Sequence, residues 1–310
     1  SEALLLHTIS DYFFNIGGKR IRPILVLITA KTFSEKIPEE VVRIGAGIEL
    51  IHMATLIHDD IIDRSPLRRN KPTAHTVWGI ENALLAGDFL LVRAFGLCGT
   101  LPSFVVEETE RACVELTEGE ILEVPMHKQK PVLTVEEGIK IAEKKTSSIF
   151  KLCCTASSYL CNASNDEIYC WREFGKNLGI AFQITDDILD VTADSETFGK
   201  NIGQDILERK PSILNLLWYH SGAKEAKILT TPPSNGNIEQ ELVSKKTALN
   251  AVKNSSAVEK AREKAFSYGR AAKEALAEIK KIRAKERKVL NEEYIFILEK
   301  LVDFSLRRIK

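Results

Sequence analysis

Apolar residues recur at three- and four-residue spacing along much of the chain, which is the period of an α-helix. The pattern is longest over residues 41–62, 135–160 and 167–191, and it predicts a helix over each of them. Alternating apolar and polar residues with turn dipeptides, the pattern typical of strands, are almost absent. The sequence therefore predicts an all-α protein.

Residues 44–62 and 174–189 are apolar on nearly every side. A helix without a polar face is buried, so we expect both at the centre of a helical bundle. Predicted breaks fall at residues 65–73, 125–133, 194–203 and 230–236, and the last is the clearest loop. It separates a motif-bearing part (15–215) from C-terminal helices (237–310), within one domain spanning residues 1–310.

Composition and charge narrow the class of protein. Of the 310 residues, 44% are hydrophobic and 28% are charged, which is a soluble globular composition. The 43 basic residues balance 43 acidic ones, so net charge favours no particular partner. The Lys- and Arg-rich stretch 253–310 is interleaved with Glu, a pattern typical of solvated helix faces. We therefore expect no nucleic-acid partner.

The six cysteines form no C-x-x-C pair, so we expect reduced and buried thiols, with a zinc site as the weaker alternative. No run of eighteen apolar residues and no signal peptide are present, so we expect no transmembrane segment and a cytoplasmic location. The chain begins at Ser1 and not at Met, so an organellar location after removal of a targeting segment stays open.

The motif D-D-x-x-D occurs twice, at residues 59–63 and 186–190. Side chains at i and i+4 share a helix face, so two such helices facing each other would place six carboxylates around one space. That many like charges disfavour folding unless cations bind between them. Oxygen ligands select a hard cation, and Mg²⁺ usually completes its shell with water and phosphate oxygens. The motifs predict a diphosphate-holding metal site for Mg²⁺, with Mn²⁺ as the alternative.

Two basic segments accompany the aspartates. Gly-Gly-Lys-Arg-Ile-Arg-Pro at 17–23 places three cations beside a flexible diglycine at a predicted helix start, where backbone N–H groups favour an anion. An ordinary polar helix N-terminus explains this segment equally well. Leu-Arg-Arg-Asn-Lys-Pro-Thr at 67–73 holds paired arginines that can bind phosphate bidentately, although taken alone it is more typical of a solvated loop.

In combination these segments resemble the trans-isoprenyl diphosphate synthases, of the long-chain octaprenyl, solanesyl or decaprenyl type. The resemblance covers about residues 15–215. Two D-D-x-x-D motifs together with these basic segments identify the family far more specifically than a single motif would. The matching segments are Gly17–Pro23, Glu49–His52, Leu56–Asp63, Arg68–Thr73, Ala86–Phe89, Glu118–Glu120, Lys145–Thr146, Phe182–Asp190, Gly199–Lys200, Gly203–Asp205 and Lys210.

The resemblance implies an isoprenoid-synthase-type helical bundle around a large central cavity, and it assigns roles by position. Several Mg²⁺ ions would be held by Asp59, Asp60, Asp63, Asp186, Asp187 and Asp190. The allylic diphosphate, or the carbon next to it, would be contacted by Arg68, Lys145, Gln183 and Lys200, with Lys210 nearby. The diphosphate of isopentenyl diphosphate would be held by Lys19, Arg22, His52 and Arg69.

The implied reaction is a sequential head-to-tail condensation of isopentenyl diphosphate onto farnesyl or geranylgeranyl diphosphate. Metal ions and cations stabilise the leaving diphosphate, so that the allylic C–O bond ionises. Thr146 and Gln183 would point dipoles at the carbocation, and the released diphosphate would take the proton. Two positions differ from the family or are constrained locally. Asn70 stands where Gly is usual but tolerates left-handed geometry, and Pro211 biases Lys210 toward an extended backbone.

Product length in the resembled family depends on how far the tail runs along the helix that carries the first aspartates. Ala54 and Thr55 lie about 6–7.5 Å below the metal site at ~1.5 Å per residue. Short-chain members place bulky aromatics there, so these small residues favour an open tunnel and an octaprenyl to decaprenyl product. The floor is expected at Ile51 or near residues 113–122. Close helix packing is the other explanation of the small residues.

Other classes of protein fit the motifs less well. A terpene cyclase would mix Asn, Ser or Thr with Glu in its second metal motif, and a squalene-synthase-like enzyme would carry D-x-x-E-D pairs. A non-catalytic partner subunit tends to lose the aspartates, and a di-iron bundle needs two E-x-x-H pairs where this chain has only Glu49–His52. A generic scaffold leaves the aspartates unexplained. The resemblance further implies a homodimer, with the long apolar product passed to a membrane.

Overall fold

The computed structural model describes residues 3–193, 202–233 and 238–309. The regular secondary structure of the described chain is helical except for one small hairpin. The first half contains α1 Leu4–Asn15, α2 Ile21–Lys31, α3 Glu39–Ile62, β1 Leu67–Arg68, β2 Lys71–Pro72, α4 Ala74–Trp78, α5 Ile80–Cys98, α6 Ser103–Leu122 and the short 3₁₀ helix η1 Met126–Lys128. The second half contains α7 Val135–Ala142, η2 Glu143–Ser147, α8 Ser148–Leu160, α9 Asn165–Thr192, α11 Gln204–Leu207, α12 Ile213–His220, the 3₁₀ helix η3 Lys224–Thr230, α13 Ile238–Lys253, α14 Ser256–Lys285 and α15 Glu292–Arg307.

The prediction of an all-α protein is confirmed, and the three predicted helices are present. Residues 41–62 lie in α3 and residues 167–191 in α9. Residues 135–160 are helical throughout, but the segment η2 in their middle is a π-helix, which the spacing of apolar residues did not reveal. Ser164 caps α9 by a reciprocal capping box with Glu167, an arrangement worth about 1 kcal/mol.

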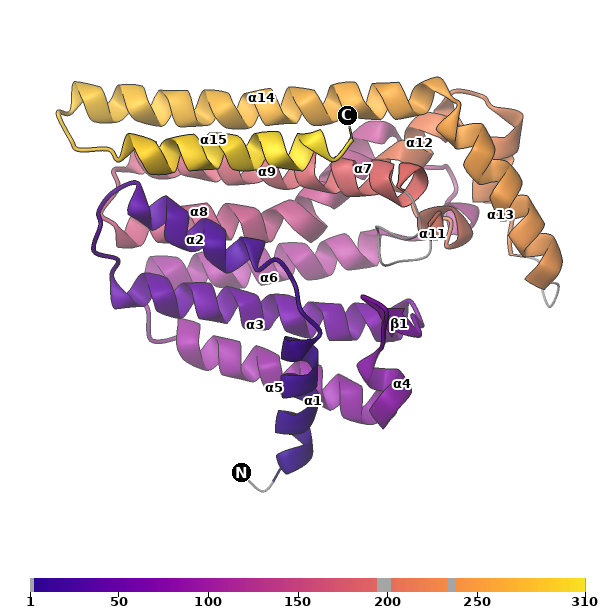
Figure 1. The fold of residues 1–310 in the computed structure, drawn as a ribbon, viewed down its shortest axis with the longest axis horizontal. Helices are drawn as coiled ribbons and strands as arrows, with labels where there is room; N and C mark the ends of the chain where they lie inside the picture. Colours follow the sequence, from indigo (N-terminus) through magenta and orange to yellow (C-terminus); the bar gives the residue numbers. More distant parts are fainter. Residues whose placement is uncertain (1–2, 194–201, 234–237, 310) are drawn as a thin grey trace.

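The long helices run side by side along the molecule, with α1 crossing them and α13 projecting at one end (Figure 1). Helix α9 lies inside this bundle and packs against α8 and α14, and α3 packs against α5. Trp171 and Phe174 of α9 and Ile44 and Ile48 of α3 are fully buried. The expectation that both aspartate-bearing helices occupy the centre is therefore confirmed.

Small residues allow α9 to approach its neighbours closely. A Cβ on Gly175 would lie 2.5 Å from the carbonyl oxygen of Phe150, and one on Gly179 would lie 2.7 Å from Cα of Ser147. Both distances are shorter than real Cβ contacts, and both neighbouring atoms belong to the backbone, so they cannot move away by a side-chain rotation. The two glycines are four residues apart and share a face, so α9 seats against α8 and η2 along this stripe. This packing fixes the aspartate end of α9 relative to η2.

Helix α3 has the length and hydropathy of a membrane span, alone among the helices described. More than half of the relevant window is buried inside the protein, as in a core helix of a bundle. All six cysteines are free thiols, of which Cys98, Cys153, Cys154 and Cys170 are buried. The predicted burial is thus confirmed for these four, whereas Cys113 and Cys161 are half-buried.

The C-terminal helices match the expected solvated faces, with one exception. Lys281 and Glu278 pair across one turn of α14 on an exposed surface. Arg283, however, is buried, and its guanidinium donates to the fully buried Glu167 at 2.8 Å. This ion pair ties α14 to the N-terminus of α9.

Candidate active site

The two aspartate motifs lie on the last turn of α3 and on the last two turns of α9, and they face two adjoining hollows. The first hollow, of about 200 Å³, is lined by Asp59, Asp63, Asp187, Asp205, Glu123, Lys145 and Lys210. The second, of about 550 Å³, is lined by Lys19, Arg20, Arg22, His52, Arg69, Asp186 and Arg308. We call them the acidic hollow and the basic hollow. Leu56, Arg68, Thr146 and Gln183 line both and form their common wall.

Five of the six aspartates have hydrogen-bond or ion-pair partners in the described chain, and the partners differ. Asp60 accepts from the Arg68 guanidinium at 2.7–2.9 Å, Asp63 pairs with Lys210 at 3.1 Å, and Asp186 accepts from Arg308 at 2.9 Å. In the second motif, Asp187 accepts from Gln183 and from the backbone N–H of Ile213, and Asp190 accepts from the backbone N–H groups of Gln204 and Asp205. Asp190 therefore holds the N-terminus of α11 in this arrangement.

Burial changes the protonation of the carboxylates that face the acidic hollow. It raises the pKa of Asp59 to about 7, and it also raises that of Asp187 to about 7 despite hydrogen bonds from Gln183 and Ile213. Burial and the neighbouring Asp190 and Asp187 raise the pKa of Asp205 well above its usual range. Carboxylates that resist ionisation when alone are stabilised by a cation placed among them.

The donor set fits a hard divalent cation, because every acidic ligand in this hollow is a carboxylate oxygen. In the described part of the chain, no three His, Cys, Asp or Glu side chains are already gathered around one point. Instead, Lys210 forms an ion pair with Asp63, and Arg68 forms one with Asp60. Of the predicted metal ligands, Asp59, Asp63 and Asp187 thus line the acidic hollow, where Lys145, Lys210 and Arg68 also lie, and Asp186 lines the basic hollow.

The π-helix η2 places two neighbouring residues in the acidic hollow. Lys145 and Thr146 would point about 100° apart on a regular helix, yet both line this space. Gly119 of α6 allows the segment to approach, since a Cβ there would lie 2.5 Å from the backbone nitrogen of Lys145. π-Helical turns are frequent at functional sites because they re-aim side chains in this way.

Two glutamates hold the Lys145 ammonium, at 2.7 Å from Glu120 and 2.6 Å from Glu123. Burial alone would lower the pKa of Lys145, but Glu123, Glu120 and Asp59 together raise it above its usual value. Lys210 behaves alike: burial is outweighed by Glu123, Asp63 and Glu208, and its pKa is raised. Both lysines are therefore charged at neutral pH. Lys210 lies within the site despite the backbone restriction imposed by the proline after it.

The common wall has a defined hydrogen-bond direction. The Gln183 amide donates from Nε2 to Asp187 at 2.8 Å, and its Oε1 accepts from the Thr146 hydroxyl at 2.6 Å. Both carboxylate oxygens of Asp187 accept hydrogen bonds, one from Gln183 and one from the Ile213 backbone, so the donor end of the amide faces Asp187. The amide oxygen and the hydroxyl oxygen therefore lie together at the boundary between the two hollows.

The basic hollow gathers the cations that the sequence predicted. Lys19 stacks on Phe304, Arg22 donates to His52 at 3.0 Å, and Arg69 donates to the carbonyl of Gly17. The hairpin β1–β2 directs Arg68 and Arg69 here, and Asn70 has φ +62°, so the expected left-handed turn is confirmed. Burial lowers the pKa of Arg22, and its Nε has no hydrogen-bond partner among the residues that the structure describes.

His52 is neutral in this setting. Burial and the nearby Arg22, Arg68, Arg69 and Arg20 lower its pKa well below the usual value. An arginine only donates, so the Nε2 of His52 accepts from Arg22. Glu49 of the same E-x-x-H motif pairs with Arg20 at 2.7 Å. Both residues of this motif thus bind arginines in the described protein, which argues against a di-iron site.

Sequence reasoning missed several residues of the site. Glu123 and Arg308 belong to none of the predicted segments, yet each contacts a predicted residue. Arg308 lies beside Phe182 at the end of α15, and no local pattern links that end of the chain to α9. A signal existed for Glu123, which follows Glu120 by three residues and so shares its helix face. Lys200, predicted for the allylic diphosphate, lies outside the described residues.

The chain-length residues separate from one another. Ala54 is fully buried in a cluster with Ala83, Ala86 and Leu90 of α5, whereas Thr55 is half-buried and its hydroxyl donates to the carbonyl of His52. Ile51 is buried in the main core. An apolar hollow of about 610 Å³ lies between α5 and α6 and is lined by Phe95, Cys98, Val106, Thr109, Cys113, Val114, Thr117 and Ile121.

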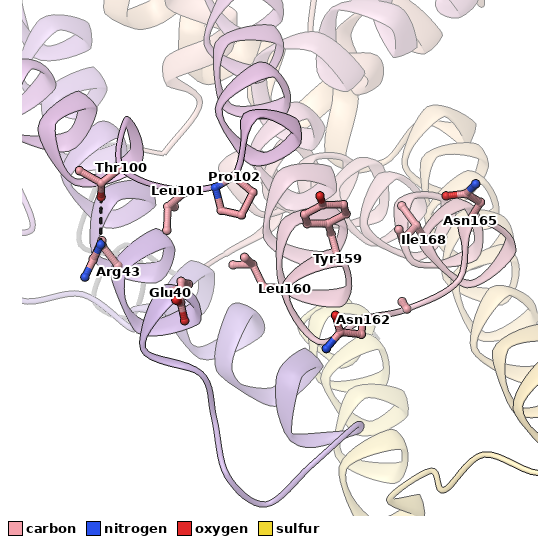
Figure 2. Close-up of a pocket in the computed structure, with 11 residues that line it drawn as sticks. Glu40, Arg43, Thr100, Leu101, Pro102, Tyr159, Leu160, Asn162, Asn165 and Ile168 are labelled. Atoms are coloured by element: carbon pink, nitrogen blue, oxygen red, sulfur yellow. Dashed lines mark hydrogen bonds between the residues drawn. The ribbon is translucent and has the colours of Figure 1, made fainter.

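Size alone does not identify the site. A hollow of about 830 Å³ lies at the opposite ends of α3 and α9 (Figure 2). Arg43 donates a hydrogen bond to Thr100 there, and the side chains of Tyr159 and Asn162 line the wall. Glu40 and Arg43 are its only charged lining residues in the described chain. Most charged lining residues, and the groups whose pKa values are shifted by burial, lie in the smaller acidic and basic hollows. We therefore take these two hollows as the candidate active site.

The model of the family described as polyprenyl synthetase matches residues 3–252. The chain is 38% identical to the all-trans-nonaprenyl-diphosphate synthase (geranyl-diphosphate specific) of Rhodobacter capsulatus over 214 residues, which are 69% of this chain and 65% of that protein. It is 36% identical to the octaprenyl diphosphate synthase of Escherichia coli strain K12 over 239 residues, 76% of this chain and 73% of that protein. It is 34% identical to the geranylgeranyl diphosphate synthase of Methanosarcina mazei over 225 residues, 71% and 69% of the two chains.

Solved structures share the fold over almost the full length. A polyprenyl synthase from Caulobacter crescentus CB15, complexed with calcium and isoprenyl diphosphate, matches with a TM-score of 0.85 and 29% identity over 99% of this chain and 90% of that one. A decaprenyl diphosphate synthase from Rhodobacter capsulatus matches with a TM-score of 0.83 and 28% identity over 98% and 90%. The predicted bundle architecture is therefore confirmed.

Proposed function

Because this chain belongs to the polyprenyl synthetase family, we propose that it is a prenyltransferase that condenses isopentenyl diphosphate head to tail with an allylic diphosphate. The observation that carries the proposal is the pair of adjoining hollows with a common wall. One hollow combines carboxylates with two lysines, and the other is lined by cations. Two diphosphates held in such neighbouring sites would bring their carbon chains together at the wall, which is the proximity that a condensation needs.

The acidic hollow would bind the allylic diphosphate. Lys145, Lys210 and Arg68 line it and would contact the phosphate oxygens, with Lys200 as a further predicted contact. Asp59, Asp60, Asp63, Asp186, Asp187 and Asp190 would hold Mg²⁺. When bound there, Mg²⁺ would neutralise the diphosphate and make it a better leaving group. Arg68 and Lys210, which occupy Asp60 and Asp63, would turn to the phosphate.

The basic hollow would bind isopentenyl diphosphate through Lys19, Arg22, His52 and Arg69. Neutral His52 accepts from Arg22, so it would orient this guanidinium and leave the remaining N–H groups for phosphate. Because that nitrogen is occupied, His52 is a poor candidate for the base that removes the proton. The released diphosphate would serve as the base.

Thr146 and Gln183 would stabilise the allylic carbocation. Their oxygens lie at the boundary between the hollows, and the Gln183 amide is oriented by its bond to Asp187. Oriented dipoles of this kind stabilise charge without having to reorganise during the reaction. The buried surroundings of α3 and α9 would also exclude water, which would otherwise quench the cation.

We propose a long-chain product, octaprenyl to decaprenyl, with a shorter geranylgeranyl or farnesyl product as the alternative. The tail would pass half-buried Thr55 and enter the hollow between α5 and α6, whose 610 Å³ lies in the range of about 300–1,000 Å³ typical of ligand pockets. Cys113 and Thr117 of that hollow fall within the expected floor region. Relatives named for octaprenyl and for geranylgeranyl products are both similar to the chain, so similarity does not decide the length.

The expected homodimer is part of this proposal. Exposed apolar side chains on α5 and α6, which support an interface there, are Val92, Phe95, Val114, Ile121 and Leu122. A partner on this face would also cover the apolar hollow. Transfer of the product to a membrane and a cytoplasmic location, or an organellar one, stay predictions.

Product analysis tests the proposal. Purified protein is incubated with Mg²⁺, labelled isopentenyl diphosphate and farnesyl diphosphate, and product length is measured by chromatography. We expect a ladder that ends at octaprenyl or longer. A product that stops at geranylgeranyl would retain the reaction but refute the long-chain assignment. No incorporation with any allylic starter would favour a non-catalytic partner subunit.

A further inference from the structure

Glu123 directly follows α6 as its C-terminal cap and lines the acidic hollow, although no motif contains it. Its side chain is 17% exposed, so it lies largely inside the protein. One carboxylate oxygen is 2.6 Å from the ammonium of Lys145 and 3.9 Å from that of Lys210. In the described chain it is the one carboxylate that pairs with both lysines.

The two lysines come from different parts of the chain. Lys145 lies in the π-helix η2, and Lys210 lies in the connection between α11 and α12. Each has a flexible four-carbon stem, and a lysine binds as a point charge without a fixed direction. A carboxylate shared by both ammonium groups restricts them to one side of the hollow. Glu123 therefore joins two segments that are far apart in the sequence.

The same contact determines which aspartates remain available. Lys145 pairs with Glu120 and Glu123, and among the described residues it pairs with no aspartate. Asp59, which faces the same hollow, makes no ion pair in the described chain. Asp59 and Lys145 line the same hollow, and the charge of Asp59 contributes to the raised pKa of Lys145 after those of the two glutamates. The glutamates keep the lysine away from a predicted metal ligand.

We propose that Glu123 is a positioning residue that holds Lys145 and Lys210 in place for the allylic diphosphate and keeps Lys145 off Asp59. The inference rests on the proposed function. When the diphosphate binds, its oxygens accept hydrogen bonds from the ammonium groups of Lys145 and Lys210, which Glu123 has already positioned. No bond is made or broken by Glu123, and its role is to orient the two cations.

Glu120 provides a matched control. It lies one turn before Glu123 on α6, is 20% exposed, and is 2.7 Å from Lys145. Unlike Glu123, it makes no ion pair with Lys210 in the described chain. The two glutamates therefore match in charge, burial and contact with Lys145, and differ in the second lysine.

The test compares Glu123→Gln, Glu120→Gln and Glu123→Asp in the full chain. Measured quantities are kcat, KM for each substrate, the melting temperature, and the Kd of inorganic diphosphate without metal. For Glu123→Gln we expect kcat to fall about 10- to 100-fold, as is typical when a supporting residue of a charged site is lost. Inorganic diphosphate should bind several-fold more tightly, because one negative charge is gone. Glu120→Gln should lose less kcat, and Glu123→Asp should recover part of the loss.

Tighter binding of diphosphate together with slower turnover would not result from a general loss of structure. Wild-type kcat in Glu123→Gln, or equal losses in Glu120→Gln and Glu123→Gln, would overturn the proposal. A higher Mg²⁺ requirement with weaker diphosphate binding would make Glu123 a metal ligand instead, which also overturns it. An inactive wild-type protein would refute the proposed function itself, and is distinguished by the wild-type reaction alone.

Discussion

Gly119→Ala should separate the geometry of η2 from the stability of the fold. A Cβ at this position would lie 2.5 Å from the nitrogen, 2.9 Å from the Cα and 3.0 Å from the Cβ of Lys145. Ordinary Cβ contacts begin near 3.4 Å, so α6 and η2 would have to separate by about 0.9 Å. The atoms involved are mainly backbone, so no side-chain rotation relieves the clash.

The separation should reduce catalysis more than stability. Overpacking of this kind costs about 1–3 kcal/mol of unfolding free energy. A misplacement of about 1 Å at reacting groups costs roughly 100-fold in rate, and here both Lys145 and Thr146 would move. We therefore expect kcat to fall by about two orders of magnitude while most of the protein remains folded at assay temperature.

Gly96→Ala is the control, because a Cβ at this position of α5 meets no atom within 4 Å. It should stabilise the protein by about 0.5–1 kcal/mol through helix propensity and leave kcat unchanged. Urea denaturation and steady-state turnover are measured for both variants. Wild-type kcat in Gly119→Ala would refute the claim that close approach of α6 positions η2.

Three further predictions concern chain length and pH. Ala54→Phe should destabilise the protein by about 1–3 kcal/mol because it overpacks a closed cluster. Thr55→Phe should shorten the product with less loss of stability, and a Thr55→Phe product as long as that of wild type by chromatography would contradict this. Folding lowers the pKa of His52, so as the pH falls below about 6.5 the imidazole is protonated in the unfolded chain and not in the folded one. Urea denaturation should therefore show the unfolding free energy of wild type falling by up to about 1.4 kcal/mol per pH unit more than that of His52→Asn. Because Asp59 has a raised pKa of about 7, protons compete with Mg²⁺ below that pH, and this group should weaken Mg²⁺ affinity about tenfold between pH 8 and pH 6. Calorimetry should find the pH dependence smaller by this factor in Asp59→Asn, with the part due to Asp187 retained.

Local patterns predicted much of this protein because they depend on short-range rules. The spacing of apolar residues predicts the helices α3 and α9. The segment at 67–73 predicts that Arg68 and Arg69 lie at the site, where Arg68 lines both hollows and Arg69 lines the basic one. The left-handed Asn70 was predictable for the same reason, since its backbone preference is local.

What the sequence did not predict depends on contacts between distant segments. The π-helix η2 requires α6 and α9 to press on it at Gly119 and Gly179, and nothing in residues 143–147 alone indicates that. Arg308 reaches Asp186 from 122 positions away. Ala54 and Thr55 are neighbours in sequence, and only the packing of α3 against α5 shows that one is enclosed and the other half-buried.

The most direct test of the central claim is a single measurement of condensation. Labelled isopentenyl diphosphate and farnesyl diphosphate are incubated with excess protein, with Mg²⁺ and then with a chelator, and the first condensation product is quantified. We predict rapid formation of geranylgeranyl diphosphate or longer products with Mg²⁺, and none with the chelator. Condensation that persists without divalent metal, or its absence under both conditions, would contradict the assignment of the two hollows as a diphosphate-binding active site.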